Sequence, residues 1–249
     1  MSADIPSLAM LRFWVLRIVA TTSLRLSERS RQIHAPPPTG RSAATHFTLI
    51  ARLPAVAGTQ IGQIMADLQS LYPAHHYYPA DTIHVTIRNL DDAAREECNQ
   101  LSLFSKIRDL AEGGGSFVLK GKGLGVSPNS VFLQLYPEDK GLANLRHQLS
   151  TATSDRDRRR PKGSGIVGGL ARRYLFEKMA FATLIRFSGP VTPAFLAEVA
   201  RHRETDFGTF SINAVEIVRT DKFLSNAGTE IIARIVVGGD LCESPLGST

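Results

Sequence analysis

The sequence predicts an α+β or mixed α/β body, because strand-like and helix-like segments alternate from His46 onward. Each half of this body holds a strand-like segment with a threonine followed by a hydrophobic residue, and a helix-like segment follows each one. This repetition is compatible with an internal duplication. The chain has 249 residues, 43% of them hydrophobic and 21% charged, which allows a sizeable core and excludes wholesale disorder.

The first part of the body is expected to run strand, helix, loop, strand. Residues 46–53 (HFTLIARL) are strand-like and end at Pro54. Residues 61–71 repeat hydrophobic side chains at helical spacing. Residues 72–80 form a loop with a proline near each end. Residues 82–90 (TIHVTIRNL) alternate polar and β-branched types, which predicts a strand.

A helix and a hairpin come next. The acidic residues at 91 and 92 favour a helix start, because the helix dipole stabilises negative charge there. This helix is expected to end at the glycine run 113–115. Residues 116–124 and 129–136 then form a hairpin around a turn that contains glycine and proline.

The second half is expected to contain two helices and three strands around a basic loop. Thr192 is a suitable cap for the second of these helices, since its hydroxyl can accept a hydrogen bond from the first turn. In order, the predicted elements are a helix over 140–152, the basic loop 155–173, a strand over 179–187, a helix over 193–203, and strands over 211–219 and 230–237 joined by a turn at 226–228.

Positive charge is concentrated in two segments of a chain whose net charge is +6. Residues 1–45 carry six arginines against Asp4 and Glu28, and the basic loop carries seven basic residues against Asp155 and Asp157. The remaining body is therefore slightly acidic. This distribution disfavours a uniformly basic nucleic-acid-coating protein, and it is compatible with a body that has basic arms.

The chain is expected to divide into an extension over 1–45, one domain over 46–240 and a short tail over 241–249. Residues 8–24 are mostly apolar but shorter than a membrane span, and Arg12 and Arg17 interrupt them. We therefore expect no stable membrane span. The arginine- and serine-rich, acid-poor extension is typical of an organellar targeting segment, and a simple unfolded extension is the alternative. We otherwise expect a cytoplasmic monomer.

The two cysteines, Cys98 and Cys242, exclude a disulfide scaffold and a multi-cysteine zinc site. Two cysteines suit a reducing compartment. We expect neither a metal nor a cofactor.

The strand over 82–90 has an unusual polar face. Side chains alternate along a strand, so Thr82, His84, Thr86 and Arg88 share one face, opposite a face of isoleucine and valine. His84 and Thr86 lie about 6.6 Å apart along the strand, so both can contact one phosphate group. The imidazole can transfer a proton near neutral pH, and the hydroxyl can donate to a phosphate oxygen. The alternative is a polar face that only meets water.

The strand over 179–187 has a similar pattern. By simple alternation Phe181, Thr183 and Ile185 share one face of it, and Arg186 follows near its end. Thr183 matches Thr86, and Phe181 stands where the first strand has its histidine.

These two strands resemble the paired motifs of the 2H phosphoesterases, the family of 2′-5′ RNA ligase-like proteins and RNA 2′,3′-cyclic phosphodiesterases. The first motif is His84-Val-Thr86-Ile, and the second is Phe181-Ala-Thr183-Leu-Ile-Arg186, where the family commonly has His-x-Thr-Leu-x-Arg. Residues 215–234 are also similar to the closing strand–turn–strand of the family. The resemblance covers about residues 46–238.

The resemblance implies a bilobal α+β fold, with two antiparallel sheets, outer helices and a central cleft. It implies a metal-independent phosphodiesterase in which His84 is the retained general acid/base and Thr86 and Thr183 hold the phosphate. Arg186, Tyr78 and Phe181 would contact an RNA end or a small cyclic nucleotide. Phe181 cannot transfer a proton, and losing one of an acid/base pair typically costs about 10²–10⁴ in rate. A catalytically inactive RNA- or nucleotide-binding module is therefore the alternative function, and an ordinary partner-binding domain is a third.

Other residues near the motifs are candidates for the same site. His46 begins a second His-x-Thr sequence, and His75 and His76 precede Tyr77 and Tyr78 in the loop before the first motif. These residues either rim a nucleotide pocket or form an ordinary exposed loop. The basic loop either holds a phosphate backbone, with strong salt dependence, or is simply solvated.

Overall fold

A computed structural model of the protein describes residues 46–54, 59–91, 100–127, 129–152, 179–221, 224 and 228–238. The predictions for the extension over 1–45, the basic loop over 155–173 and the tail over 241–249 lie outside these residues. The proposed domain limits therefore remain predictions.

The described residues form an α+β structure, as the sequence predicted. The strands are β1 (His46–Arg52), β2 (His76–Tyr77), β3 (His84–Asn89), β4 (Phe117–Ser127), β5 (Ser130–Pro137), β6 (Ala180–Arg186), β7 (Asp206–Ile212), β8 (Ala214–Thr220) and β9 (Glu230–Val236). The α-helices are α2 (Gln60–Leu71), α4 (Gln100–Glu112), α5 (Gly141–Ala152) and α7 (Pro193–Arg201), with a short 3₁₀ helix over Ala80–Thr82.

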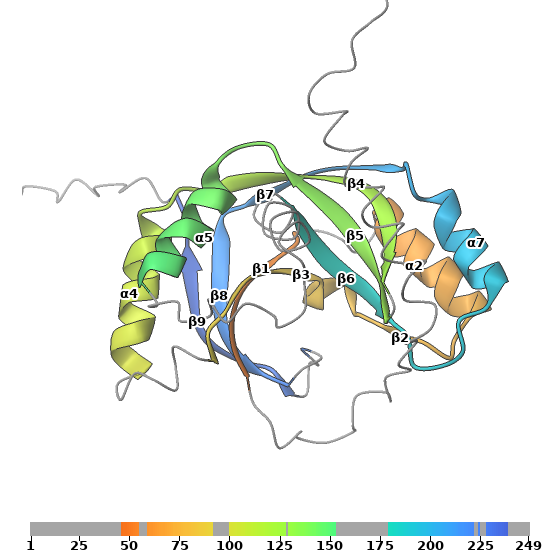
Figure 1. Ribbon diagram of the computed structural model, residues 1–249, viewed down its shortest axis with the longest axis horizontal. Coiled ribbons are helices and arrows are strands. Elements are labelled where there is room, and N and C mark those ends of the chain that lie inside the picture. Colours follow the sequence, from red (N-terminus) through yellow and green to blue (C-terminus); the bar gives the residue numbers. More distant parts are fainter. Residues whose placement is uncertain are drawn as a thin grey trace, which may run out of the picture.

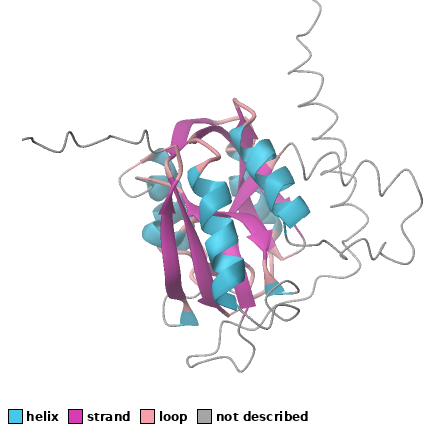
Figure 2. Cartoon of the chain, turned by 90° about the vertical axis from the view of Figure 1, so that its left-hand side faces the viewer, coloured by secondary structure: helices cyan, strands magenta, loops and turns pink. Residues whose placement is uncertain are grey.

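All strands belong to one antiparallel sheet with the order β7-β4-β5-β6-β3-β1-β8-β9, and β2 pairs with β6. The sheet has two halves that meet between β3 and β6, where Val85 and Ala182 form a single residue pair. The helices lie at the outer ends of the molecule, α4 and α5 at one end and α2 and α7 at the other, with the strands between them (Figure 1). Figure 2 shows the helices of one end in front of the strands. The predicted fold class is confirmed, and the two expected sheets are joined into one.

Helix α7 illustrates how local sequence sets an element. The hydroxyl of Thr192 accepts a hydrogen bond from the backbone N–H of Phe195 at 3.1 Å, and Pro193 occupies the first turn, where its missing N–H costs nothing. Phe195 and Val199, four residues apart, are buried against the core. The predicted cap is confirmed, and the helix ends two residues before the predicted end.

The structure corrects the prediction for the last strands. The segment expected as one strand over 211–219 is the end of β7 and most of β8, separated at Asn213. Strand β7 was missed because it lies at the edge of the sheet and buries only Phe210 and Ile212, so its sequence lacks the strong apolar alternation of a central strand. Residues 72–80, expected as a loop, contain β2, whose two residues are too few to show any periodicity.

None of the helices in the described ranges is long and apolar enough to cross a membrane.

Candidate functional site

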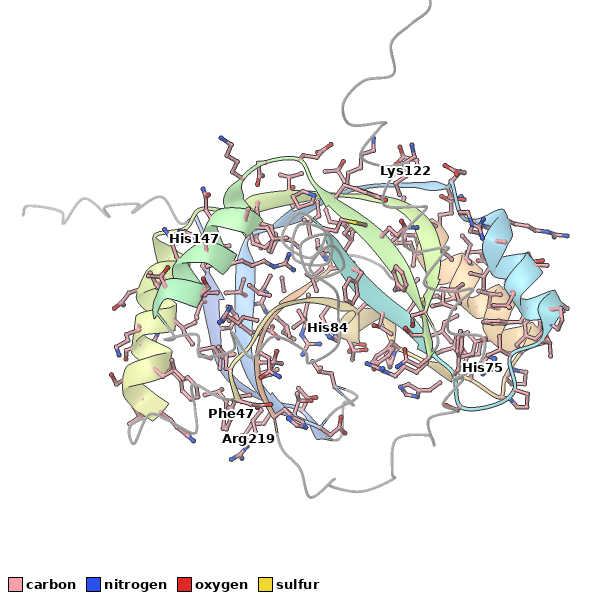
Figure 3. The ribbon with its side chains drawn as sticks, in the orientation of Figure 1. Phe47, His75, His84, Lys122, His147 and Arg219 are labelled. Atoms are coloured by element: carbon pink, nitrogen blue, oxygen red, sulfur yellow. The ribbon has the colours of Figure 1, made fainter. Side chains whose placement is uncertain are left out.

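The junction of β3 and β6 brings the two predicted motifs together. Val85 pairs with Ala182 in antiparallel register, and both side chains are buried. Continuing this register by one residue in each direction places His84 opposite Thr183 and Thr86 opposite Phe181. Since side chains alternate along a strand, these four side chains share the face opposite Val85 and Ala182. Figure 3 shows His84 in the middle of the molecule, between the two groups of helices.

A β-bulge in β6 adds Arg186 to this face. Thr183 pairs with Phe132 on β5, whereas Ile185 pairs with Val131, so β6 has one extra residue between them. Ile185 is fully buried on the core side. The prediction that Ile185 shares the face of Thr183 is therefore wrong. Arg186 would point into the core if alternation continued, but the extra residue turns it to the face of Thr183.

The hydrogen bonds of His84 determine which nitrogen can act. Its Nδ1 lies 2.7 Å from the carbonyl oxygen of Thr82, and a carbonyl only accepts, so Nδ1 carries the proton in the neutral ring. Nε2 is then the atom that can accept a proton. Burial lowers the pKa of His84, and the guanidinium groups of Arg52 and Arg186 lower it further. The bond to Thr82 and the carboxylate of Glu216 act in the opposite direction.

Tyr78 holds Arg186. The Nε of Arg186 donates to the hydroxyl oxygen of Tyr78 at 2.9 Å, and the Tyr78 ring centroid lies 6.4 Å from that of His84. Burial raises the pKa of Tyr78, so its hydroxyl stays protonated. Because Tyr78 is 4% exposed, its ring is not a surface on which a base can stack. It orients the arginine instead.

An ion pair beside His84 was missed by the sequence analysis. Arg52 is the cross-strand neighbour of His84, and its Nε lies 2.7 Å from Oε2 of Glu216 on β8. Its Nη1 also donates to the carbonyl of Asp81 at 2.9 Å. The signal was present, since Arg52 ends a mainly apolar strand segment and Glu216 lies between Val215 and Ile217 in another. Their contact, however, depends on the order of strands in the sheet.

Arg146 was also missed. From α5, its Nη1 donates to the carbonyl of Met179 at 2.9 Å and its Nη2 to the carbonyl of Thr86 at 3.2 Å. One guanidinium therefore ties the start of β6 to the motif of β3.

The other candidate histidines lie in different surroundings. His46 pairs with Asp91 at 2.7 Å, at the end of β1 remote from Arg52, about 20 Å away along the strand. His75 is buried between the rings of Phe187 and Phe195, so neither alternative given for it, the rim of a pocket or an ordinary exposed loop, holds.

His76 and Tyr77, which follow His75 in the chain, contact different parts of the structure. His76 pairs with Arg186 in the sheet, and its ring centroid lies 5.1 Å from that of Tyr78. The hydroxyl of Tyr77 donates to carbonyls at the end of α2, at 2.9 and 3.0 Å, which gives it a structural role.

Within the ranges that the structure describes, no three histidine, cysteine, aspartate or glutamate side chains cluster in a way that would hold a metal ion. Apart from the Glu216 carboxylate, which is paired with Arg52, the groups at the site are hydroxyls, an imidazole and guanidinium groups, which suit an anionic ligand.

Comparison with known proteins extends these observations. No protein-family model matches the sequence, and no curated protein does. Among solved structures, the chain is similar to TT0787 of Thermus thermophilus, with a TM-score of 0.50 and 16% identity over 78% of this chain and 99% of that one. A crystal structure of a phosphoesterase gives a TM-score of 0.47 and 14% identity, covering 79% of this chain and 100% of the other. E. coli LigT complexed with 3′-AMP gives 0.46 and 14%, covering 78% and 99%.

The likeness to TT0787 concerns the fold and spans most of both chains. The chain therefore has the α+β fold of TT0787, in agreement with the fold class that the sequence predicted.

Proposed function

We propose that the protein binds a phosphodiester at the β3–β6 junction and hydrolyses 2′,3′-cyclic phosphates at RNA ends or on small nucleotides. The observation that supports this proposal is the register of β3 and β6. In this register His84 lies opposite Thr183, and Thr86 lies on the same face of the sheet. In this role Thr86 and Thr183 donate hydrogen bonds to phosphate oxygens. Arg186, held by Tyr78, supplies a positive charge.

His84 acts as the general base. Nε2 takes a proton from a water molecule, the water oxygen attacks phosphorus, and the bond from phosphorus to one ribose oxygen breaks. The products are a phosphate monoester and a ribose hydroxyl. In an in-line reaction the leaving oxygen lies opposite the attacking water, on the side away from His84. Phe181 has no proton to donate, so the leaving oxygen takes its proton from solvent, and His84 returns its own to solvent.

The test uses the full chain and a nucleoside 2′,3′-cyclic phosphate. We expect slow turnover that His84→Ala abolishes, with His46→Ala as the matched control because His46 lies far from the site. Turnover that survives His84→Ala in a folded variant would contradict the assignment.

A proton donor introduced at position 181 tests the other half of the same mechanism, the protonation of the leaving oxygen. We expect Phe181→His to raise the rate at least tenfold, because a second acid/base group typically contributes about 10²–10⁴. If a soluble, folded Phe181→His variant shows no gain in rate, the result would count against a reacting phosphate between His84 and residue 181.

One observation favours a second function, a catalytically inactive RNA- or nucleotide-binding module. Phe181 is 45% exposed at the position where a proton donor would stand. Binding that weakens as salt rises, together with no turnover by the wild-type protein, would support this function and exclude hydrolysis.

A further inference from the structure

Phe181 is an exposed apolar side chain within the proposed phosphate site. The other large exposed hydrophobic residues of the described chain are Leu71, Leu101, Ile231 and Val236, which lie on α2, α4 and β9. Phe181 instead lies on β6 two residues from Thr183, about 6.6 Å along the strand, and on the same face. A ligand group that covers this ring would therefore lie next to the phosphate-binding groups.

Phe132 extends the apolar surface of Phe181. The two ring centroids lie 5.7 Å apart at an interplanar angle of 58°, and Phe132 is the cross-strand partner of Thr183. On its other side Phe132 pairs with Gly125 of β4, where an added Cβ would lie 2.4 Å from Cζ of Phe132. The ring thus lies over the backbone of β4, and only glycine leaves room for it there. We call Phe132 and Phe181 the aromatic platform.

Gln134 offers a polar group beside the aromatic platform. It is the cross-strand partner of Phe181, and its Oε1 accepts a hydrogen bond from the hydroxyl of Tyr136 at 3.0 Å. Burial raises the pKa of Tyr136 to about 12, so the hydroxyl keeps its proton and acts as the donor. This bond uses the amide oxygen, which leaves the NH₂ end as the one that can donate to a ligand.

We propose that the aromatic platform stacks the nucleobase of the ligand, while the Gln134 amide donates to an acceptor on the edge of the base. This inference rests on the proposed function, because it needs a phosphate at the neighbouring hydroxyls. The ligand class is then a nucleotide or the terminal nucleotide of an RNA, rather than a phosphodiester without a base. Base–aromatic stacking tolerates every base, so all four nucleotides should bind.

The experiment measures dissociation constants of the full chain by calorimetry. Three ligands are compared: a nucleoside 2′,3′-cyclic phosphate, 1-O-methyl-ribose 2′,3′-cyclic phosphate, which lacks a base, and inorganic phosphate. We expect the wild-type protein to bind the nucleoside compound about 5- to 150-fold more tightly than the compound without a base. Phe181→Leu keeps an apolar side chain but removes the ring, and it should abolish most of this difference while leaving phosphate binding unchanged.

Two further variants make the result specific. Gly125→Ala should displace the Phe132 ring and reduce the same difference without touching the ligand. Leu71→Ala removes an exposed hydrophobic side chain elsewhere and should change nothing. Equal binding of the compounds with and without a base, or a base preference that survives Phe181→Leu, overturns the aromatic platform alone. Failure of the wild-type protein to bind any of the three ligands overturns the proposed function, and the aromatic platform with it.

Discussion

The imidazole of His84 is 8% exposed, and its protonation is controlled by what surrounds it. Taking a charged imidazolium out of water is unfavourable, and the guanidinium group of Arg52 lies on the neighbouring strand. Both effects favour the neutral ring, which is the form that can accept a proton at Nε2. Glu216 opposes them, but its carboxylate is already paired with Arg52.

The pKa of His84 should therefore lie below 6.5, its ordinary value. Arg52→Met should raise it, because the variant removes a positive charge and leaves Glu216 without its arginine partner. The measurement is a histidine NMR titration, with Arg219→Met as the control because Arg219 pairs with Glu230 on β9. A pKa at or above 6.5 in the wild-type protein, or no change in Arg52→Met, would contradict this account.

The same shift affects stability. Unfolded His84 binds its proton at a higher pH than folded His84, so unfolding takes up a proton as the pH falls below 6.5. The contribution of His84 to stability is thus present above pH 6.5 and is lost as the pH falls through the lower, folded pKa. Chemical denaturation from pH 7.5 to 5 should show a smaller decline in His84→Gln than in the wild-type protein. An identical decline in both proteins would show that other groups account for it.

At the scale of elements, β3 and β6 share only one residue pair, so other contacts must hold the motif strands in place. Arg146 of α5 supplies such contacts, because its guanidinium donates to the carbonyl of Thr86 in β3 and to that of Met179, directly before β6. Burial lowers the pKa of Arg146. Hydrogen bonds from a charged group contribute about 1.5–3 kcal/mol, more than bonds between neutral groups.

We expect Arg146→Met to lower the free energy of unfolding by about 1.5–3 kcal/mol and to weaken cyclic phosphate binding, because Thr86 and Met179 lose the group that bonds to both of their carbonyls. Arg201→Met is the matched control, since Arg201 is exposed and pairs with Glu198 of its own helix. It should change stability by about 0.5 kcal/mol or less. Urea denaturation measures both. Equal effects of the two substitutions would contradict a bridging role for Arg146.

At the scale of the whole molecule, the proposed site exists only because the two halves of the sheet meet. β5, β4 and β7 lie on the side of β6, and β1, β8 and β9 on the side of β3. Thr183 and Arg186 thus come from one half, and His84 and Thr86 from the other. Ala182 stands at the meeting point and is fully buried against Val85 and Leu133, its partners on the two sides.

A larger side chain at the meeting point should separate the halves. We expect Ala182→Leu to destabilise the protein by about 1–3 kcal/mol, the typical cost of overpacking. It should also weaken ligand binding by more than the fraction of unfolded protein accounts for. Val236→Leu, at an exposed position of β9, enlarges a side chain away from the junction and should be neutral. Unchanged binding by a folded Ala182→Leu protein would show that the two halves bind ligand independently.

Local sequence determined the helices and the central strands of this protein. The apolar spacing of α2, the cap at Thr192 and the alternation of β3 from His84 to Thr86 are properties of neighbouring residues, and the structure has each of them. The prediction that Thr82 and Arg88 share this face is wrong, because Thr82 lies in the short 3₁₀ helix before β3 and an extra residue between Thr86 and Arg88 shifts the register with β1. Alternation also placed His84 and Thr86 on one face, because that face depends only on the strand itself. The sequence did not predict the edge strand β7, because few of its side chains are buried and its apolar alternation is weak.

Only the tertiary structure decided how the site is assembled. The bulge that turns Arg186 away from the core, the pairing of Arg52 with Glu216 and the bridge made by Arg146 all join residues from different elements. Distance along the chain gives no measure of such contacts, since they follow from the order and register of strands in the sheet. The sequence determined which chemical groups each strand carries, and the meeting of β3 with β6 decided which of them face one another.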